Sequence, residues 1–494
     1  MSDRAPVVVV GSGPGGAAAA VFLSRAGANT LVLEAGQEHS RLGFTARIGG
    51  ITVARRRPPR KRRGELTFLG DPATEIYEEL APGGLSNQWS CAVPRFADAD
   101  FKDAERAGVE YTWPVGYADL APWYDRVEPL LSIAGQTGDA AQLPAGKVAQ
   151  ARKLGEDWQP VQAASEAQGR SIVVMPYAYG GGTFFTRSGT PFNAYSRLIE
   201  PARRRGELSV RYDSRVVRLE WSPSERRVVG AVCVSSRGVE TTVRCRAVVL
   251  AAGAVNSAQI LLESEHADFP HGLGNHHDVL GRYLHDHPLG KLVLDLGKPI
   301  SVSPASYVTR PALERSIPLY AAALMQWSGT DLMARTLLAG RPGRSTEIGF
   351  SVFGTMAPTR DDFVALDKKQ PRRDGRSALL LALRHPPEAR TALDQARDDV
   401  LESLTRVGLE PRARIWNVEA PGNSVHYGGT CRMHASPRYG VVDAWSRVHD
   451  VPNVAVADSS VFTTGPEKNP VLTAMVLGAR AADRLAQELR SGDL

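Results

Sequence analysis

The chain has 494 residues, more than one hydrophobic core usually holds, so its length predicts two domains. Hydrophobic residues make up 43% of it, as in an ordinary globular protein, and the net charge is +6. Four widely spaced cysteines without a CxxC pair argue against a disulfide framework and indicate a reducing compartment. No basic and apolar leader precedes the first strand, and the longest apolar run is too short to span a bilayer. We therefore expect a cytoplasmic protein without a membrane span.

The chain opens with a strand–turn–helix–strand pattern. An apolar strand, Val7–Val10, leads into a turn with Gly11, Gly13 and Gly16, an alanine-rich helix and a second strand that ends before Glu34. Such a turn needs glycine for a tight bend, for close backbone approach to a pyrophosphate and for close helix–strand packing. The helix start offers free N–H groups to phosphates, and a carboxylate at this spacing can bind a ribose. The pattern predicts a dinucleotide site; the alternative is the same unit without a ligand.

Residues 54–64 form a basic run that packs seven lysines and arginines between Arg55 and Arg63. Such a run is usually a solvated loop. The alternative is a patch for an anionic substrate, partner or surface. The run holds no aromatic residue, which argues against base stacking and a nucleic-acid partner.

The middle of the chain carries a glycine loop, a strand meander and a second glycine turn. Paired glycines, Gly83 and Gly84, would let a flat ligand approach the backbone closely. Alternating apolar residues predict a meander of strands between Ser214 and Val243. A second strand–glycine–helix passage follows, with its turn at Gly253. We expect this passage to return a strand to the same nucleotide.

Residues 271–290 hold five of the eleven histidines. Their spacing gives no HxxxH pair with a carboxylate, and no cysteine joins them, so we expect no metal site. Residues 299–369 alternate strands and loops, as in a sheet that forms a pocket. Residues 388–407 place four apolar side chains on one helical face, and Gly408 is the expected stop.

The C-terminal region combines a glycine-rich turn with a long helix. The turn, NSVHYGGTCRM, carries His426, and a buried strand ends at Asp458. The long helix is predicted to have Asn469 as its N-cap and Pro470 as its first residue. A helix start carries partial positive charge and unpaired N–H groups. Aimed at a flavin's pyrimidine edge, it would stabilise the negative charge that develops on reduction.

These motifs, in this order, resemble those of the glucose–methanol–choline (GMC) flavin oxidoreductases. The matching motifs are the opening fingerprint, GGLSNQW, AAGAVNSAQILL, HYGGTCRM, ADSSVF and NPVLTA. The chain looks closest to the pyranose-oxidase and cholesterol-oxidase branch, whose catalytic pair is a histidine with an asparagine. The resemblance implies an α/β protein with a Rossmann-like FAD-binding domain of the GMC type and a second, sheet-containing α+β substrate domain. It is thin over residues 101–186 and 291–421.

The resemblance also implies how the domains divide the chain. The FAD-binding domain would take residues 1–100, 187–290 and 422–494, and the last segment would carry the catalytic pair. The substrate domain would take residues 101–186 and 291–421.

The resemblance further implies the residues of the site. His426 matches the catalytic histidine and Asn469 its partner. The residues that match FAD-binding positions are Gly11, Gly13, Gly16, Glu34, Gly83, Gly84, Asn87, Val216, Gly253, Ala254, Asp458, Pro470 and Val471. Fungal pyranose oxidases carry, in the glycine loop, a histidine that links covalently to the flavin. Here the loop reads Ser86-Asn87-Gln88-Trp89, so FAD should be non-covalent.

The residue types agree with alcohol oxidation, which removes a proton from oxygen and a hydride from carbon. A histidine near its natural pKa can take the proton at neutral pH. The amide of Asn469 can hold the alcohol oxygen, and the flavin takes the hydride. The alternatives are that His426 is a structural turn residue and that Asn469 is a plain helix cap.

The sequence and the resemblance together predict FAD-dependent oxidation of a CH–OH group to a carbonyl. The small-molecule substrate would be a sugar or sugar-like natural product, an inference that rests on the resemblance alone. Dioxygen or another acceptor would reoxidise the flavin. The runner-up is a dehydrogenase of a non-sugar alcohol, or a redox-neutral lyase on the same fold. A different class is a flavin-bearing binding protein that uses the basic run for an anionic partner.

Overall fold

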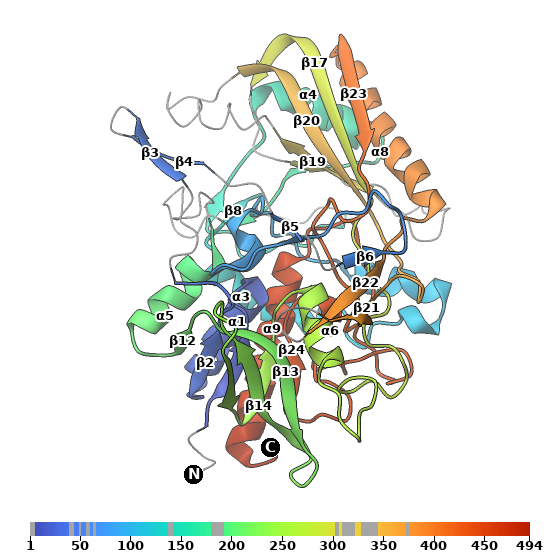
Figure 1. Cartoon of the computed structure of the whole chain (residues 1–494). Helices are drawn as coiled ribbons and strands as arrows, with labels where there is room; N and C mark the ends of the chain where they lie inside the picture. The colour runs from blue at the N-terminus through green and yellow to red at the C-terminus, as the bar shows by residue number, and fades with distance from the viewer. Residues whose placement is uncertain are drawn as a thin grey trace.

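The structure is a computed structural model of the chain. It describes residues 5–38, 44–48, 51–55, 60–62, 66–136, 142–178, 192–301, 306–308, 322–327, 344–371 and 376–494. These residues form a mixed α/β protein with two main sheets, one in the lower and one in the upper half of Figure 1. Among the described helices, none combines the length and the apolar character that a transmembrane span needs.

The lower sheet is parallel and carries the glycine turns at the ends of its strands. Strands β1 (Val7–Val10), β16 (Ala247–Leu250) and β24 (Val454–Val456) are apolar and fully buried, as expected for a parallel sheet that is covered on both faces, whereas the edge strand β12 (Ser209–Arg211) is largely exposed. The predicted strand–turn–helix–strand unit is confirmed, and so is the returning strand after the meander. In order across the sheet the strands are β12, β2 (Thr30–Leu33), β1, β16 and β24.

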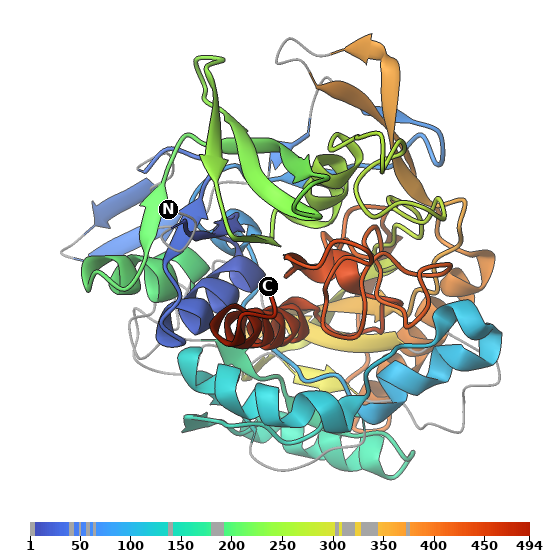
Figure 2. The ribbon, with the colours of Figure 1, turned by 90° about the horizontal axis from the view of Figure 1, so that it is seen from below.

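Helices cover this sheet, and the two longest partners come from opposite ends of the chain. Helix α1 (Pro14–Arg25) packs against α9 (Val471–Ser491), and the two lie side by side when the molecule is seen from below (Figure 2). A third helix, α3 (Tyr117–Val127), packs on α9 as well. Helix α6 (Ala254–Leu262) follows the second glycine turn and contacts the predicted meander. The meander consists of β13 (Arg215–Ser222), β14 (Arg227–Val234) and β15 (Glu240–Arg244).

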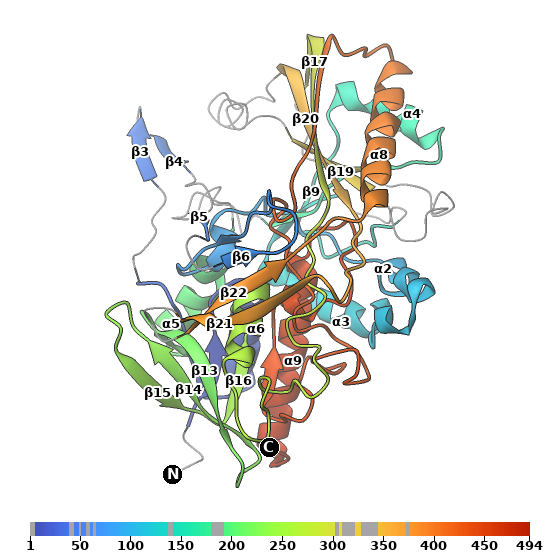
Figure 3. The ribbon, with the colours of Figure 1, turned by 45° about the vertical axis from the view of Figure 1, so that its right-hand side comes forward.

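The upper sheet is antiparallel, and helices pack on one of its faces. Helix α8 (Pro387–Thr405) runs along that face with α4 (Gln159–Glu166) beside it (Figures 1 and 3). The predicted helix over residues 388–407 is thereby confirmed, and its four apolar residues are buried. In order the strands are β10 (Ile172–Val174), β18 (Ser306–Val308), β19 (Ala322–Trp327), β20 (Arg344–Gly354), β17 (Leu289–Ser301) and β23 (Ala413–Val418).

Smaller sheets connect the two halves. Strand β22 (Ser377–Ala382) pairs with β6 (Leu66–Phe68) on one side and with β21 (Phe363–Pro371) on the other, and β21 contacts α6. A short ribbon, β5 (Arg60–Lys61) with β7 (Tyr77–Glu78), runs between the two main sheets in Figure 1. Besides short 3₁₀ helices, the other described elements are β3 (Phe44–Ile48), β4 (Ile51–Arg55), α2 (Asp98–Lys102), β8 (Ile133–Gly135), β9 (Gln150–Ala151), β11 (Tyr177–Ala178), a π-helix (Tyr195–Ile199) and α5 (Glu200–Arg204).

The opening turn uses its glycines in different ways. Gly11 has a φ of +98°, which side-chain-bearing residues rarely adopt. A Cβ on Gly16 would lie 2.2 Å from the carbonyl oxygen of Gly11, so this glycine allows the helix to pack closely on the strand. A Cβ on Gly13 would meet nothing within 4 Å, so this position faces open space. The sequence did not single out Gly15, where a Cβ would lie 1.8 Å from the carbonyl oxygen of Ala457.

We predict that Gly15→Ala destabilises the protein strongly, because α1 would have to move away from the end of β24. Forcing a methyl group into such a contact costs about 1–3 kcal/mol or more. The matched control is Gly13→Ala, which enters open space at a φ of −66° and should change stability little. Urea denaturation of the two apoproteins and the wild type measures the difference. Equal midpoints for both variants would contradict this account of the turn.

Candidate active site

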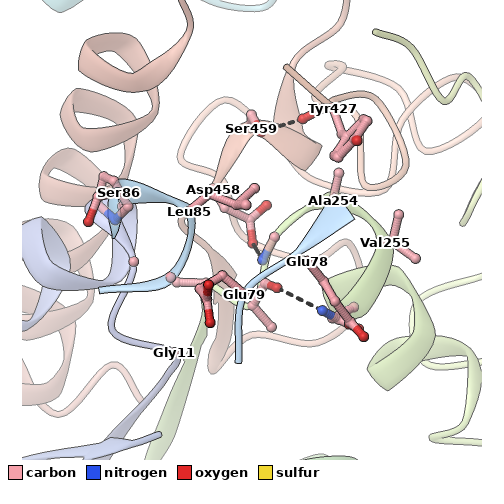
Figure 4. Close-up of a pocket in the computed structure, with 18 of the residues that line it drawn as sticks. Gly11, Glu78, Glu79, Leu85, Ser86, Ala254, Val255, Tyr427, Asp458 and Ser459 are labelled. Carbon is pink, nitrogen blue, oxygen red and sulfur yellow. Dashed lines mark hydrogen bonds between the residues drawn. The ribbon is translucent and has the colours of Figure 1, made fainter. Parts of the chain in front are cut away.

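The described residues enclose an elongated cavity of about 440 Å³ at the carboxyl ends of the parallel strands. In open α/β sheets ligands bind at this edge. Figure 4 shows part of the wall, with Gly11, Ala254 and Asp458 around the cavity. The sequence-predicted residues that line it are Gly11, Gly13, Glu34, Gly84, Val216, Gly253, Ala254, His426, Asp458, Asn469, Pro470 and Val471.

Three predicted residues do not line the cavity but shape it. Gly16 is the packing glycine of α1. Gly83 has a φ of +96°, and its backbone N–H donates to the hydroxyl of Ser12 at 2.9 Å. The amide of Asn87 donates to the carbonyl oxygens of Pro82 at 3.0 Å and Gly84 at 2.8 Å. Asn87 therefore fixes the glycine loop from within.

Glu34 is buried at one end of the cavity and is held by the opening turn. One carboxylate oxygen accepts from the backbone N–H and the hydroxyl of Ser12, and the other accepts from the N–H of Gly36 at 2.7 Å. Burial raises the pKa of Glu34, and these hydrogen bonds oppose the rise. Because Ser12 also accepts from Gly83, the turn, the acid and the glycine loop form one connected unit.

Asp458 ties the second glycine turn to the C-terminal segment. One of its oxygens accepts from the N–H of Gly253 at 2.9 Å and from the hydroxyl of Ser257 at 2.6 Å. The other accepts from the N–H of Ser460 at 2.9 Å. This carboxylate is thus satisfied at the N-terminus of α6, where its charge is also favourable.

His426 and Asn469 meet at the other end of the cavity. Nε2 of His426 lies 3.3 Å from Nδ2 of Asn469, although the two residues are 43 positions apart. The prediction that Asn469 caps the long helix is wrong. Helix α9 begins at Val471 with Pro470 as its N-cap, and proline disfavours helical geometry in the residue before it. Asn469 therefore lies outside the helix, and its amide can reach the imidazole.

Buried acidic groups fix the segments that carry this pair. Lys468 is fully buried, and its ammonium contacts Asp100 at 2.7 Å and Glu467 at 3.0 Å. This ion cluster holds the chain immediately before Asn469. The backbone N–H of His426 donates to Asp286 at 2.7 Å, and the N–H of Ser424 donates to the same carboxylate at 3.1 Å. Burial raises the pKa of Asp286 to about 6.

The imidazole of His426 is held in a neutral state. Desolvation lowers the pKa of His426 from 6.5 to about 4, although part of its surface faces the cavity. The expectation of a nearly natural pKa is therefore wrong. The rings of His287 and Phe353 flank it at centroid distances of 4.9 and 5.3 Å. At neutral pH His426 can accept a proton but does not carry one in excess.

His287 and Asp286 were missed by the sequence reasoning. Their signal was the HDH sequence in the histidine-rich segment, which was judged only by metal-ligand spacing. In the described part of the chain, no group of three His, Cys, Asp or Glu side chains is arranged to hold a metal ion. Instead His285 fills the space beside Gly428, where a Cβ would lie 2.5 Å from its Nε2.

The basic run also differs from its expected form. Arg62 is buried and lines the cavity, so the solvated-loop expectation is wrong for this residue. Its guanidinium donates to the side-chain oxygens of Asn256 and Gln259 on α6, both at 3.0 Å, and lies 3.8 Å from Glu78. Lys61 is half-exposed and pairs with Glu75. Residues 56–59 and 63 lie outside the described residues.

The residues present fit a flavin dinucleotide. Open space at Gly13 lies before the start of α1, where free N–H groups can meet a pyrophosphate. The Glu34 end supplies a carboxylate for a ribose. The opposite end presents His426 and Asn469 beside the start of α9, where positive helix-end charge can stabilise a reduced ring.

Comparison with known proteins identifies two matching family models. The FAD binding domain matches residues 6–283, more than half of the chain. The GMC oxidoreductase family model matches residues 365–478. FAD is thus the cofactor of this protein.

Relatives match along nearly the whole chain. Paromamine 6'-oxidase of Streptomyces fradiae is 27% identical and covers 98% of this chain and 92% of its own length. The 2-methyl-1,2-propanediol dehydrogenase of Mycolicibacterium austroafricanum is 25% identical, and the match covers 98% of this chain and 96% of the length of that enzyme. The crystal structure of pyridoxine 4-oxidase from Mesorbium loti has a TM-score of 0.68 at 16% identity and covers 98% of this chain and 99% of its own. At that identity it shows a shared fold.

We predict that Arg62→Gln weakens FAD binding, because Arg62 joins the segment around β7, which lines the cavity, to α6. Hydrogen bonds made by a charged group contribute about 1.5–3 kcal/mol each, so a dissociation constant at least about tenfold higher is expected. Lys61→Gln, which removes the neighbouring exposed charge, is the matched control and should leave the constant unchanged. Titration of apoprotein with FAD, followed by flavin fluorescence, measures both. A similar loss for the two variants would assign the effect to net charge.

Proposed function

Because the chain belongs to the GMC family of FAD-dependent oxidoreductases, we propose that it oxidises a CH–OH group of a sugar-like small molecule to a carbonyl, with His426 as the base. The observation that carries the proposal is the contact between His426 and Asn469 at one end of the cofactor cavity. The two segments have no sequence proximity, and each is anchored separately by buried acidic groups. A shared ligand gives both a reason to converge.

The pair divides the work on the alcohol. Nε2 of His426 takes the hydroxyl proton, and its low pKa keeps it unprotonated before substrate binds. The amide of Asn469 holds the alcohol oxygen without titrating. The bound flavin supplies the hydride acceptor. The start of α9 places positive helix-end charge beside the reacting region, and the buried ring of Phe353 helps to exclude water from it.

The substrate class is supported by relatives of this chain rather than by its own residues. The relative named paromamine 6'-oxidase supports a sugar-like alcohol. The 2-methyl-1,2-propanediol dehydrogenase supports the second candidate, a non-sugar alcohol. Anaerobic bleaching of the flavin with a panel of sugars and short diols separates the two. Absence of bleaching with every alcohol would favour the lyase or the binding-protein alternative.

The remaining expectations are part of the same proposal. The domain division at residues 101–186 and 291–421 assigns the upper sheet to substrate binding. All four cysteines are buried free thiols, which supports a cytoplasmic location. Dioxygen or another acceptor would reoxidise the flavin, and oxygen consumption during turnover would test whether dioxygen does so. We expect no nucleic-acid partner, which gel-shift experiments with nucleic acid would test.

We predict that FAD is bound without a covalent link. Residues 84–90 of the glycine loop contain no histidine, cysteine or tyrosine that could form one. The purified protein should be yellow, and acid precipitation should leave FAD in the supernatant. Flavin that remains in the washed pellet would contradict this.

We predict that the His426→Ala variant still binds FAD, but that substrate reduces its flavin on the order of 10²–10⁴ times more slowly than the flavin of the wild type. The loss should shrink at high pH, where hydroxide can take the alcohol proton. His449→Ala, at a residue outside the cavity whose Nε2 contacts the carbonyl oxygen of His434, is the control and should keep the wild-type rate. Anaerobic stopped-flow absorbance measures the rates. Equal rates for wild type and His426→Ala would remove His426 from the mechanism.

The same experiment across pH tests the lowered pKa. His426 acts in its neutral form, and its pKa is about 4, so the wild-type rate should be flat through the neutral range and fall only as pH approaches 4. A decline centred at the ordinary histidine value of 6.5 would show that the imidazole is not desolvated in the working enzyme.

A further inference from the structure

His426 makes contacts through both of its ring nitrogens. Nε2 faces Asn469, as described, and Nδ1 lies 3.4 Å from Nδ1 of His287. The two imidazole planes meet at 70°, and His287 is only 2% exposed. The proposed function uses Nε2 and leaves this second contact unexplained.

Counting protons shows what the second contact requires. The amide nitrogen of Asn469 can only donate, so Nε2 of His426 must present its lone pair to it. A neutral imidazole has a single N–H, which is then on Nδ1 of His426. Two ring nitrogens can share a hydrogen bond only when one is protonated. Nδ1 of His287 must therefore accept, and its own proton is on Nε2.

We propose that His287 is a positioning residue that holds His426 in the tautomer with a bare Nε2. This assignment rests on the proposed function, in which Nε2 is the atom that takes the substrate proton. With the proton on Nε2 instead, His426 could not accept another there. His287 is not among the residues that line the cavity, and it acts through its contact with His426.

The surroundings keep His287 in the accepting form. Its pKa is well below 6.5, because it is buried and because His426, His285 and His385 lie near it. A protonated His287 would carry N–H groups at both nitrogens and could not accept from Nδ1 of His426. Neighbouring imidazoles therefore preserve the direction of this hydrogen bond.

The backbones of the two histidines are joined by a short relay of hydrogen bonds. The N–H of His287 donates to the hydroxyl of Ser424 at 3.1 Å, and that hydroxyl donates to Asp286. The same carboxylate accepts from the N–H of His426 at 2.7 Å. One serine and one buried carboxylate thus fix the separation of the two rings.

The test is a long-range ¹H–¹⁵N spectrum of the FAD-loaded protein labelled at histidine, which reports which ring nitrogen carries the proton. His426→Gln assigns the signals. In the wild type, Nδ1 of His426 should be protonated and Nε2 bare. His287→Leu removes the acceptor for Nδ1–H, so the opposite tautomer should become populated beside the original one, which the amide of Asn469 still favours. His287→Asn, whose side-chain oxygen can accept in place of Nδ1, should restore the wild-type pattern.

His449→Asn is the matched control, since it replaces a histidine that lies outside the cavity and whose Nε2 contacts the carbonyl oxygen of His434. It should leave the tautomer unchanged. When the substrate is an alcohol that reduces the flavin of the wild type, His287→Leu should slow flavin reduction roughly 10–10²-fold. This loss is smaller than the one expected when the base His426 is removed. The apparent KM should change little, and His287→Asn should recover most of the rate.

A wild-type proton on Nε2, or a tautomer that His287→Leu leaves unchanged, overturns the assignment. If His287→Leu does not fold, the wild type and His287→Asn still decide it. If no alcohol reduces the flavin, the proposed function fails, while the spectra still settle the role of His287. The two failures are therefore distinguishable.

Discussion

Direct backbone contact at the opening turn is the constraint on which the rest of the structure depends. Strands β1, β16 and β24 end so close together that a single methyl group at Gly11 would meet Ala251, and one at Gly15 would meet Ala457. Asp458 follows Ala457 directly and carries the hydrogen bonds to the second glycine turn. Three segments from distant parts of the sequence are thus brought to one edge of the sheet, and the cavity lies where they meet.

The candidate site places an uncharged base among buried charges. Desolvation keeps His426 neutral, while the nearby carboxylates are satisfied by backbone N–H groups or by Lys468. Isolated buried charges would be costly, and these are paired or hydrogen-bonded. Two side chains that contact His426, those of Asp286 and His287, are themselves buried.

Sequence reasoning succeeded where the signal is local and failed where a distant contact decides. The opening unit and the helix over residues 388–407 follow from periodicity and turn chemistry within a few dozen residues. The burial of Arg62 depends on two amides of α6, almost 200 positions away. The role of His287 depends on its contact with the imidazole of His426, 139 positions further along the chain, which the local spacing of histidines does not predict. The helix was predicted to begin one residue too early, with Asn469 as its N-cap, because the sequence alone does not fix a boundary to within one residue.

The packing of α1 on α9 has a consequence for synthesis of the protein. Helix α9 is made more than 400 residues after α1. At about 5–20 residues per second, α1 waits roughly 20–90 seconds on the ribosome before its partner exists. During that interval the strands β2 and β16 and the π-helix at Tyr195–Ile199 can already contact β1 and α1, but the face of α1 that packs on α9 has not yet met its partner. That face of the nascent chain is therefore the last part of the first unit to be covered.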